Sequence, residues 1–242
     1  MSNFEVLEGK NCLITGASGG LGKEIAKSFA KIDVNLFLVG RDIRKIEDTK
    51  SEIESISKNI KISYETADLR DKNEINKVIE KVRKEFGTID ILVNCAAEFY
   101  RKPIEETSIE DYENCMNLNV KAPFLLCREF SQDMSKKEWG RIINIASSGA
   151  YNGLKNTIAY RTSKHALLGL SRVLHNELKE RNVRTFCISP GSMKTKMAKV
   201  LTEQDYSTFM DPKEVSEFII SVISFDSELV SEEIRLNRMI IR

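Results

Sequence analysis

The chain has 242 residues, of which 41% are hydrophobic and 30% are charged, and its formal net charge is +1. A balance this close to neutral excludes the strongly basic face by which proteins bind nucleic acid, and no apolar run reaches the roughly eighteen residues that a membrane-spanning helix needs. The first ten residues are mixed in charge, which argues against a secretory signal, so we expect a cytoplasmic protein.

Cysteine and histidine usage agrees with that expectation. The five cysteines, at positions 12, 95, 115, 127 and 187, are scattered and form no Cys-x-x-Cys pair. Buried free thiols that act as small hydrophobic groups explain this pattern, and they are typical of a reducing compartment. The two histidines, His165 and His175, lie on one expected helix, and we expect no metal site.

Apolar, strand-like runs alternate with amphipathic helical segments along the whole chain. The runs are compact, which is typical of parallel strands buried on both faces of a sheet. The alternation predicts one α/β domain over residues 1–242, with a doubly wound, Rossmann-type sheet of about seven mostly parallel strands and helices on both faces. The expected strands cover residues 11–15, 34–39, 60–64, 89–94, 141–146, 183–189 and 234–241. The expected helices cover residues 21–31, 43–57, 72–86, 108–134, 159–181 and 212–224.

A glycine-rich turn follows the first expected strand, with the sequence Thr15-Gly16-Ala17-Ser18-Gly19-Gly20-Leu21-Gly22. Glycines let the backbone turn sharply, approach a pyrophosphate and pack a helix against the sheet. The free N–H groups of the helix that follows favour an anion. An ordinary turn explains such a cluster when it stands alone, but its place after the first strand favours a dinucleotide site. The expected contacts are Gly16, Ser18, Gly20, Leu21 and Gly22.

The second expected strand ends in Gly40, Arg41 and Asp42. An acid at this tip would bind the ribose hydroxyls of NAD, but the position holds Gly40 and is followed by Arg41. A guanidinium there can bind the 2′-phosphate of NADP(H) through paired hydrogen bonds. We therefore expect NADP(H) as the cofactor. The alternative is NAD(H), with Arg41 in solvent and Asp42 on the ribose.

Two further expected strands end in candidate cofactor contacts. Asp68 and Leu69 follow the third strand, where the carboxylate could accept from the adenine amine. Asn94 ends the fourth strand, and the small Ala96 and its neighbours would allow a cofactor to approach closely. Each of these positions, read alone, is also explained as a loop cap or as tight packing.

Tyr160 and Lys164 lie four residues apart on one expected helix, and Ser147 lies thirteen residues before Tyr160. Four residues bring two side chains to the same helical face. A phenol has a pKa of about 10, which a neighbouring ammonium lowers, so this set can reduce C=O or oxidise CH–OH. A turn interrupts a second match, Tyr151 with Lys155, whereas Tyr160 opens a long apolar helical stripe.

In this order, the motifs resemble the short-chain dehydrogenase/reductase family, in its compact single-domain branch. The resemblance rests on the glycine turn, Asp68, residues 94–97, Asn119, Ser147, Tyr160, Lys164 and the segment 190–195. The larger epimerase/dehydratase branch has a different glycine spacing. What the resemblance implies is a catalytic tetrad of Asn119, Ser147, Tyr160 and Lys164.

The resemblance also implies a role for each group. Tyr160 would donate the proton in reduction, and Lys164 would lower the phenol pKa and bind the nicotinamide ribose. Ser147 would orient the carbonyl, with Ser148 as the competing choice. Asn119 would hold a proton-relaying water, unless it is a helix-interior amide with a backbone partner. The residues expected to wrap the nicotinamide are Pro190, Gly191, Met193 and Thr195.

Two departures from the family pattern concern packing and assembly. Residues 94–97 read Asn-Cys-Ala-Ala where the family usually has Asn-Asn-Ala-Gly, which keeps the side chains small. Residues 235–242 lack the Gly-Gly that is common near the last strand, a strand that lies at a subunit interface in many relatives. We expect a homo-oligomer, either a dimer or a tetramer.

The segment 192–211 corresponds to the substrate lid of the relatives, and its shortness predicts an open site. Basic residues surround it, namely Lys194, Lys196, Lys199, Arg161, Arg101 and Lys102. An anionic substrate, such as an acyl chain on a phosphopantetheine carrier or a phosphorylated sugar, would suit them; a solvated surface is the alternative. Phe99, Tyr151 and Met193 are candidates for an apolar wall, or for core.

The expected function is NADP(H)-dependent reduction of a small-molecule or carrier-bound carbonyl, as in the similar 3-oxoacyl-carrier-protein reductases. One alternative is an alcohol, polyol or sugar dehydrogenase that works in the oxidative direction. An alternative of another class is a non-catalytic dinucleotide-binding scaffold.

Overall fold

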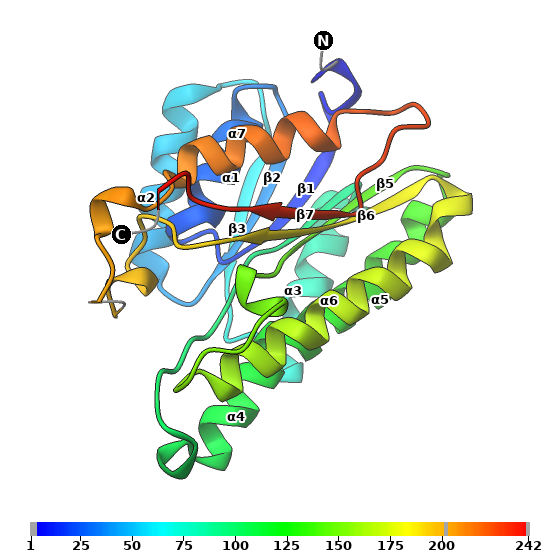
Figure 1. Cartoon of the computed structure of the whole chain (residues 1–242). Helices are drawn as coiled ribbons and strands as arrows, with labels where there is room; N and C mark the ends of the chain where they lie inside the picture. Colours follow the sequence, from blue (N-terminus) through cyan, green and yellow to red (C-terminus); the bar gives the residue numbers. More distant parts are fainter. Residues whose placement is uncertain (1–3, 201–202, 241–242) are drawn as a thin grey trace.

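A computed structural model, which describes residues 4–200 and 203–240, shows a parallel sheet between two layers of helices (Figure 1). The sheet has seven strands in the order β3-β2-β1-β4-β5-β6-β7, and every pair is parallel. The prediction of a doubly wound α/β fold is therefore confirmed. The strands are β1 (Asn11–Thr15), β2 (Asn35–Gly40), β3 (Ile62–Thr66), β4 (Ile91–Asn94), β5 (Gly140–Ile145), β6 (Val183–Pro190) and β7 (Glu233–Leu236).

The helices divide between the two faces of the sheet. On one face lie α1 (Gly20–Ala30), α2 (Ile43–Ile56) and α7 (Pro212–Ile223) (Figure 1). On the other lie α3 (Lys72–Phe86), α4 (Ile109–Met116), α5 (Ala122–Lys136) and α6 (Ile158–Leu178). Across the described residues, every helix is too short or too polar to cross a membrane.

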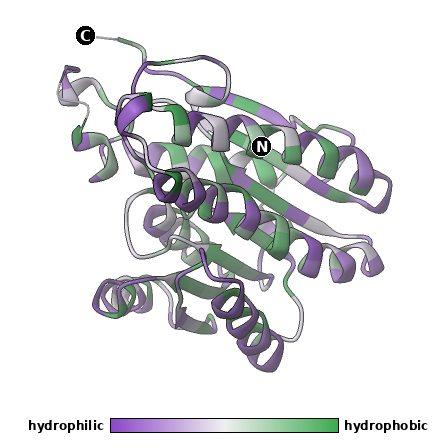
Figure 2. Ribbon diagram, turned by 90° about the horizontal axis from the view of Figure 1, so that it is seen from below, coloured by the Kyte–Doolittle hydropathy of each residue, from purple (hydrophilic) through white to green (hydrophobic). Residues whose placement is uncertain are grey.

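Alternate residues of the central strands fill the two cores. Cys12 and Ile14 of β1 pack into the core under α1 and α7, whereas Leu13 packs into the core under α3 and α5. Successive side chains point to opposite faces, so a strand covered on both sides must be apolar at every position. Figure 2 shows the strands as largely hydrophobic and the helices as mixed in polarity.

The expected helix over residues 108–134 is interrupted in the structure. A π-helical turn, η3 (Asn117–Lys121), separates α4 from α5. The physical reason is Pro123, which has no N–H to close an α-helical bond to the carbonyl of Asn119. The backbone widens instead, and the N–H of Ala122 bonds to the carbonyl of Asn117. Asn119 is the middle residue of this π-turn and is fully buried.

The last strand is shorter than the expected range of residues 234–241. β7 ends at Leu236, whose partner is Pro190, the last residue of β6. The chain then leaves the sheet, and Arg238 donates hydrogen bonds to Gln204 and Thr208 in the segment 192–211. Beyond Leu236, side-chain hydrogen bonds to this neighbouring segment take the place of the backbone hydrogen bonds between strands. Residues 241–242 lie outside the described part of the chain.

Candidate active site

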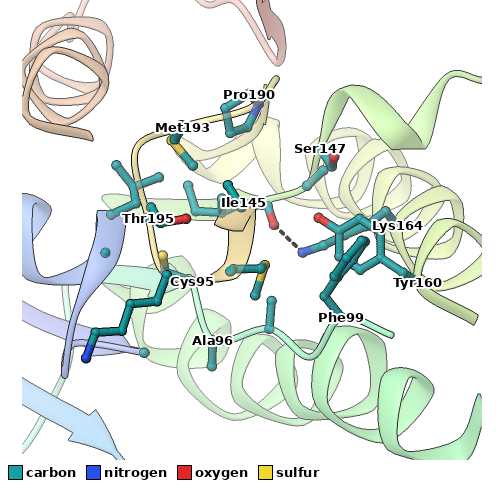
Figure 3. Close-up of a pocket in the computed structure, with 18 of the residues that line it drawn as sticks. Cys95, Ala96, Phe99, Ile145, Ser147, Tyr160, Lys164, Pro190, Met193 and Thr195 are labelled. Atoms are coloured by element: carbon teal, nitrogen blue, oxygen red, sulfur yellow. Dashed lines mark hydrogen bonds between the residues drawn. The ribbon is translucent and has the colours of Figure 1, made fainter. Parts of the chain in front are cut away.

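A cavity of about 790 Å³ opens at the carboxyl ends of the central strands (Figure 3). Its walls come from the segments that follow each of the seven strands, from α6 and from described residues of the segment 192–211. The strand order reverses between β1 and β4, and doubly wound sheets bind ligands at such a point. The sequence-predicted residues can therefore be placed relative to one pocket.

The glycine turn has the shape that a dinucleotide requires. Gly16 has a φ of 71°, and a Cβ there would lie 2.8 Å from the backbone nitrogen of Ala96. A Cβ on Gly22 would lie 2.4 Å from the carbonyl oxygen of Gly16, so only glycine lets α1 begin this close to the turn. Gly16, Ser18, Gly20 and Leu21 line the pocket, whereas Gly22 lies behind the lining.

The pocket is cationic at the end of β2. Arg41 and Lys45 both line it, and position 40, which also lines it, is a glycine and offers no acid. Asp42 also lines this end, but its carboxylate caps α2 by accepting from the Lys45 N–H at 3.3 Å. Arg41 forms an ion pair with Glu98 at 3.4 Å. Two cations and a glycine cradle fit a dinucleotide that carries an additional phosphate.

Besides Gly22, two of the predicted cofactor contacts lie outside the pocket lining. Asp68 accepts from Arg70 Nε at 3.0 Å, and this contact lowers the pKa of the Asp68 carboxyl. Asn94 is buried, and its Nδ2 donates to Asn144 Oδ1 at 2.8 Å, which links β4 to β5. Leu69 and Ala96 do line the pocket.

Tyr160, Lys164 and Ser147 meet in the pocket, as Figure 3 shows. Lys164 is 2% exposed, and its ammonium donates to the carbonyl oxygen of Ile145 at 2.7 Å. The same ammonium lies 5.7 Å from the centre of the Tyr160 ring. Phe99 holds that ring edge to face, with the two ring centres 4.7 Å apart. The predicted helical spacing thus brings the phenol and the ammonium together.

The electrostatics of this pair differ from the sequence-based expectation. Burial raises the pKa of Tyr160, and the opposing effects come from its hydrogen bond to Ser147 and the charge of Arg161. The Lys164 ammonium bonds to the carbonyl oxygen of Ile145. Burial also lowers the pKa of Lys164 to about 8, against the raising effect of three nearby cysteines.

Asn119 lies beneath Tyr160 rather than in the pocket lining. Its Oδ1 accepts from the Glu98 N–H at 2.8 Å, and its Nδ2 donates to the Glu98 carbonyl oxygen at 3.0 Å. The same Nδ2 donates to Ser163 Oγ at 2.9 Å, and that hydroxyl donates to the Tyr160 carbonyl oxygen. The side chain therefore links the segment after β4 to the helix that carries the tyrosine.

The segment 192–211 covers the pocket from the side of β6. The residues expected at the nicotinamide, Pro190, Gly191, Met193 and Thr195, all line the cavity. A Cβ on Gly20 would lie 3.4 Å from Thr195 Cγ2, so the segment packs over the start of α1. Of the surrounding basic residues, Lys196 and Arg161 line the pocket. Arg101 pairs with Glu203 and Lys102 with Asp111.

Tyr151 is not a lining residue. Its hydroxyl donates to Glu233 Oε2 at 3.2 Å, and the Arg235 guanidinium lies 4.4 Å from its ring centre. Phe99 and Met193, the other two candidates for an apolar wall, do line the pocket. All five cysteines are free, and among them only Cys95 is a lining residue.

Several lining residues have no counterpart among the sequence-predicted contacts, and Lys45, Gln204 and Arg238 are three of them. Lys45 lies one helical turn after Arg41, and this spacing is a signal that the sequence does contain. Gln204 and Arg238 come from the lid and from the segment after β7, which meet only in the folded chain. No local pattern marks either of them.

Comparison with known proteins identifies the family. A model of the short chain dehydrogenase family matches residues 10–206. The 3-oxoacyl-[acyl-carrier-protein] reductase of Aquifex aeolicus is 30% identical over 96% of this chain and 97% of its own. The 2-dehydro-3-deoxy-D-gluconate 5-dehydrogenase of Dickeya dadantii is 34% identical over 83% of this chain and 79% of its own.

A solved structure agrees with these relatives. L-sorbose reductase from Gluconobacter frateurii, complexed with NADPH and L-sorbose, superposes with a TM-score of 0.86 at 28% identity, covering 96% of this chain and 95% of its own. Together, the family match, the relatives and the shared fold show that the chain belongs to the short-chain dehydrogenase family of oxidoreductases.

Proposed function

We propose that the protein is an NADP(H)-dependent oxidoreductase that reduces a carbonyl to an alcohol. The observation that carries this proposal is the meeting of Tyr160, Lys164 and Ser147 in one cavity with the glycine turn after β1. The Tyr160 phenol, the Lys164 ammonium and the Ser147 hydroxyl thereby lie beside the glycine turn that would bind a dinucleotide. When bound, the nicotinamide supplies the hydride.

Each of these side chains has a defined task in this proposal. The Ser147 hydroxyl holds the substrate carbonyl oxygen, and the neutral Tyr160 phenol donates its proton to that oxygen. The raised pKa of Tyr160 keeps the phenol protonated for this step. Lys164 offsets the negative charge that the departing proton leaves on the phenol, and Asn119 positions the helix that carries both groups.

The proposed cofactor is NADP(H) rather than NAD(H). The support is the cationic pair Arg41 and Lys45 at the β2 end, together with a glycine rather than an acid at position 40. Guanidinium and ammonium groups favour a phosphate over a ribose hydroxyl. The NADPH complex of the sorbose reductase adds support from a relative.

Two substrate classes follow from the relatives. The Aquifex aeolicus enzyme supports a 3-oxoacyl thioester, whereas the Dickeya dadantii and Gluconobacter frateurii enzymes support a sugar or sugar acid. Polar lining residues such as Asn152, Ser192 and Gln204 favour the second class, because a sugar offers hydroxyl groups to bond them.

The test is a panel of carbonyl compounds, including a 3-oxoacyl thioester and several ketoses, with NADPH absorbance as the readout. Tyr160→Phe should abolish turnover while NADPH still binds, because the ring stays and only the proton donor is lost. Tyr151→Phe is the matched control and should retain turnover. Tight NADPH binding without turnover of any compound would favour a non-catalytic dinucleotide-binding scaffold.

A further inference from the structure

A guanidinium without a carboxylate partner stands beside the proton donor. Arg161 follows Tyr160 in α6 and lines the pocket. Its Nε donates to Thr157 Oγ1 at 3.0 Å, and its Nη1 donates to the Asn152 carbonyl oxygen at 2.8 Å. These acceptors are neutral, and within the described part of the chain Arg161 has no ion-pair partner. Nη1 also donates to Asn152 Oδ1, and among the described residues no hydrogen bond engages the second terminal nitrogen.

Arg161 is close to the groups that would hold the reacting carbonyl. A Cβ built on Gly149 would lie 3.5 Å from Arg161 Cζ and 3.3 Å from Ser147 Oγ, so the guanidinium and the hydroxyl flank the same glycine. The charge of Arg161 also lowers the pKa of Tyr160. An anion bound to Arg161 would therefore lie near the substrate carbonyl.

The charges around the pocket leave this cation unexplained. Among the described lining residues the only carboxylate is Asp42, which lies at the β2 end and pairs with Lys45. Arg41 and Lys45 are accounted for by the cofactor phosphate. Arg161 belongs to a different wall, formed by the start of α6. Since a partly buried cation is costly without an anionic partner, a substrate is the natural source of one.

We propose that Arg161 binds a carboxylate of the substrate, so that the protein acts on oxo acids and the corresponding hydroxy acids. This inference rests on the proposed function and selects between its two substrate classes. The acyl part of a 3-oxoacyl thioester carries no charge, whereas a sugar acid or another oxo acid carries a carboxylate. A guanidinium fork matches the two oxygens of a carboxylate.

The test compares oxo acids with their uncharged methyl esters, using the 2-, 3- and 4-oxopentanoates as substrates with NADPH. At least one acid should exceed its ester in kcat/KM, and Arg161→Gln should lower that value about 10- to 100-fold, the range for a charged hydrogen bond. The esters should change little. Arg161→Lys keeps the charge and should restore part of the preference. Lys155→Gln, an exposed lysine outside the lining, is the control for net charge.

A binding measurement gives a second readout. Calorimetric titration of pentanoate into the protein mixed with NADP⁺ should show saturable binding that Arg161→Gln abolishes and Lys155→Gln leaves intact. If Arg161→Gln lowered kcat/KM equally for acids and esters, Arg161 would only support the segment 152–157, and the proposal would be overturned. Esters turned over as well as acids, or no saturable pentanoate binding, would overturn it too. These outcomes leave the reductase assignment standing, whereas failure of every ester, acid and ketose would reject that assignment.

Discussion

Lys164 carries a charge in a place that is unfavourable for one. Its ammonium is almost fully buried and bonds to a single carbonyl oxygen, and its pKa is lowered from 10.5 to about 8. The proposed reduction needs this cation when Tyr160 loses its proton. As the pH rises through about 8, Lys164 becomes neutral and that support disappears.

The first prediction concerns the pH dependence of reduction. We expect kcat/KM to be flat below about pH 8 and to fall above it, because Lys164 loses its proton there. The measurement is the rate of NADPH oxidation between pH 6 and pH 10 in buffers of constant ionic strength. A profile that stays flat through pH 10 would contradict the assignment of Lys164.

The second prediction is that Lys164→Met stabilises the protein without cofactor while it removes activity. The lowered pKa corresponds to a cost of up to about 3 kcal/mol for keeping the lysine charged in the fold; part of the gain is lost with the bond to Ile145. We expect the free energy of unfolding at pH 7 to rise by about 1–3 kcal/mol.

The sign of this effect follows from the two protonation equilibria. Below the folded-state pKa of about 8, Lys164 is charged in both the folded and the unfolded chain, so the fold bears the full free-energy cost of burying the charge. Between pH 8 and 10.5 only the unfolded chain keeps the proton, and the cost shrinks. Denaturation in urea at pH 7 and pH 10 should therefore show a larger gain for Lys164→Met at the lower pH. An equal gain at both would show that packing, not charge, is responsible.

At the scale of the elements, Arg238 connects the segment after β7 to the lid. Its guanidinium donates to Gln204 Oε1 at 2.7 Å and to Thr208 Oγ1 at 3.0 Å, and it lies 4.9 Å from the ring centre of Phe209. One side chain thus holds three positions of the segment that covers the pocket. In its described parts, residues 192–200 and 203–211, the lid has no strand pairing beyond an isolated bridge between Met193 and Met210.

The third prediction follows from these contacts. Arg238→Ala removes about 1–2 kcal/mol of hydrogen bonding from the closed lid, which corresponds to about a five- to thirtyfold change in its closing equilibrium. We expect KM to rise by a factor in that range and kcat to change less. Arg235→Ala, which alters a guanidinium outside the lining, is the control. A similar rise in KM for both variants would point to a general effect on β7.

Local sequence patterns predicted most of the helices and strands, but not the features that depend on contacts between distant segments. The strands were predictable because each is a compact apolar run, and Tyr160 and Lys164 because helical spacing alone brings them together. The π-turn at Asn119 was not predicted, although Pro123 is the signal for it. The contact of Arg238 with the lid depends on where β7 ends, and the residues next to Arg238 contain no signal for the end of that strand. The raised pKa of Tyr160 likewise depends on how deeply the folded chain buries the phenol.

At the scale of the whole molecule, the pocket is assembled from segments that are far apart in the sequence, so NADPH should bind the folded chain and not the unfolded one. A ligand at about one hundred times its Kd then raises the free energy of unfolding by about 2.7 kcal/mol. For a domain of this size each kcal/mol shifts Tm by about 2–4 °C. We expect NADPH to raise Tm by about 5–10 °C.

The fourth prediction uses this linkage to test the cofactor preference independently of turnover. NADH should need at least about ten times the concentration of NADPH for the same rise in Tm, because only NADPH offers a 2′-phosphate to Arg41 and Lys45. Arg41→Ala should remove most of that difference by weakening NADPH alone. Arg44→Ala, an exposed arginine in the first turn of α2 that does not line the pocket, should leave it intact. Equal shifts with the two cofactors in the unaltered protein would instead assign the ribose to Asp42 and leave Arg41 to its ion pair with Glu98.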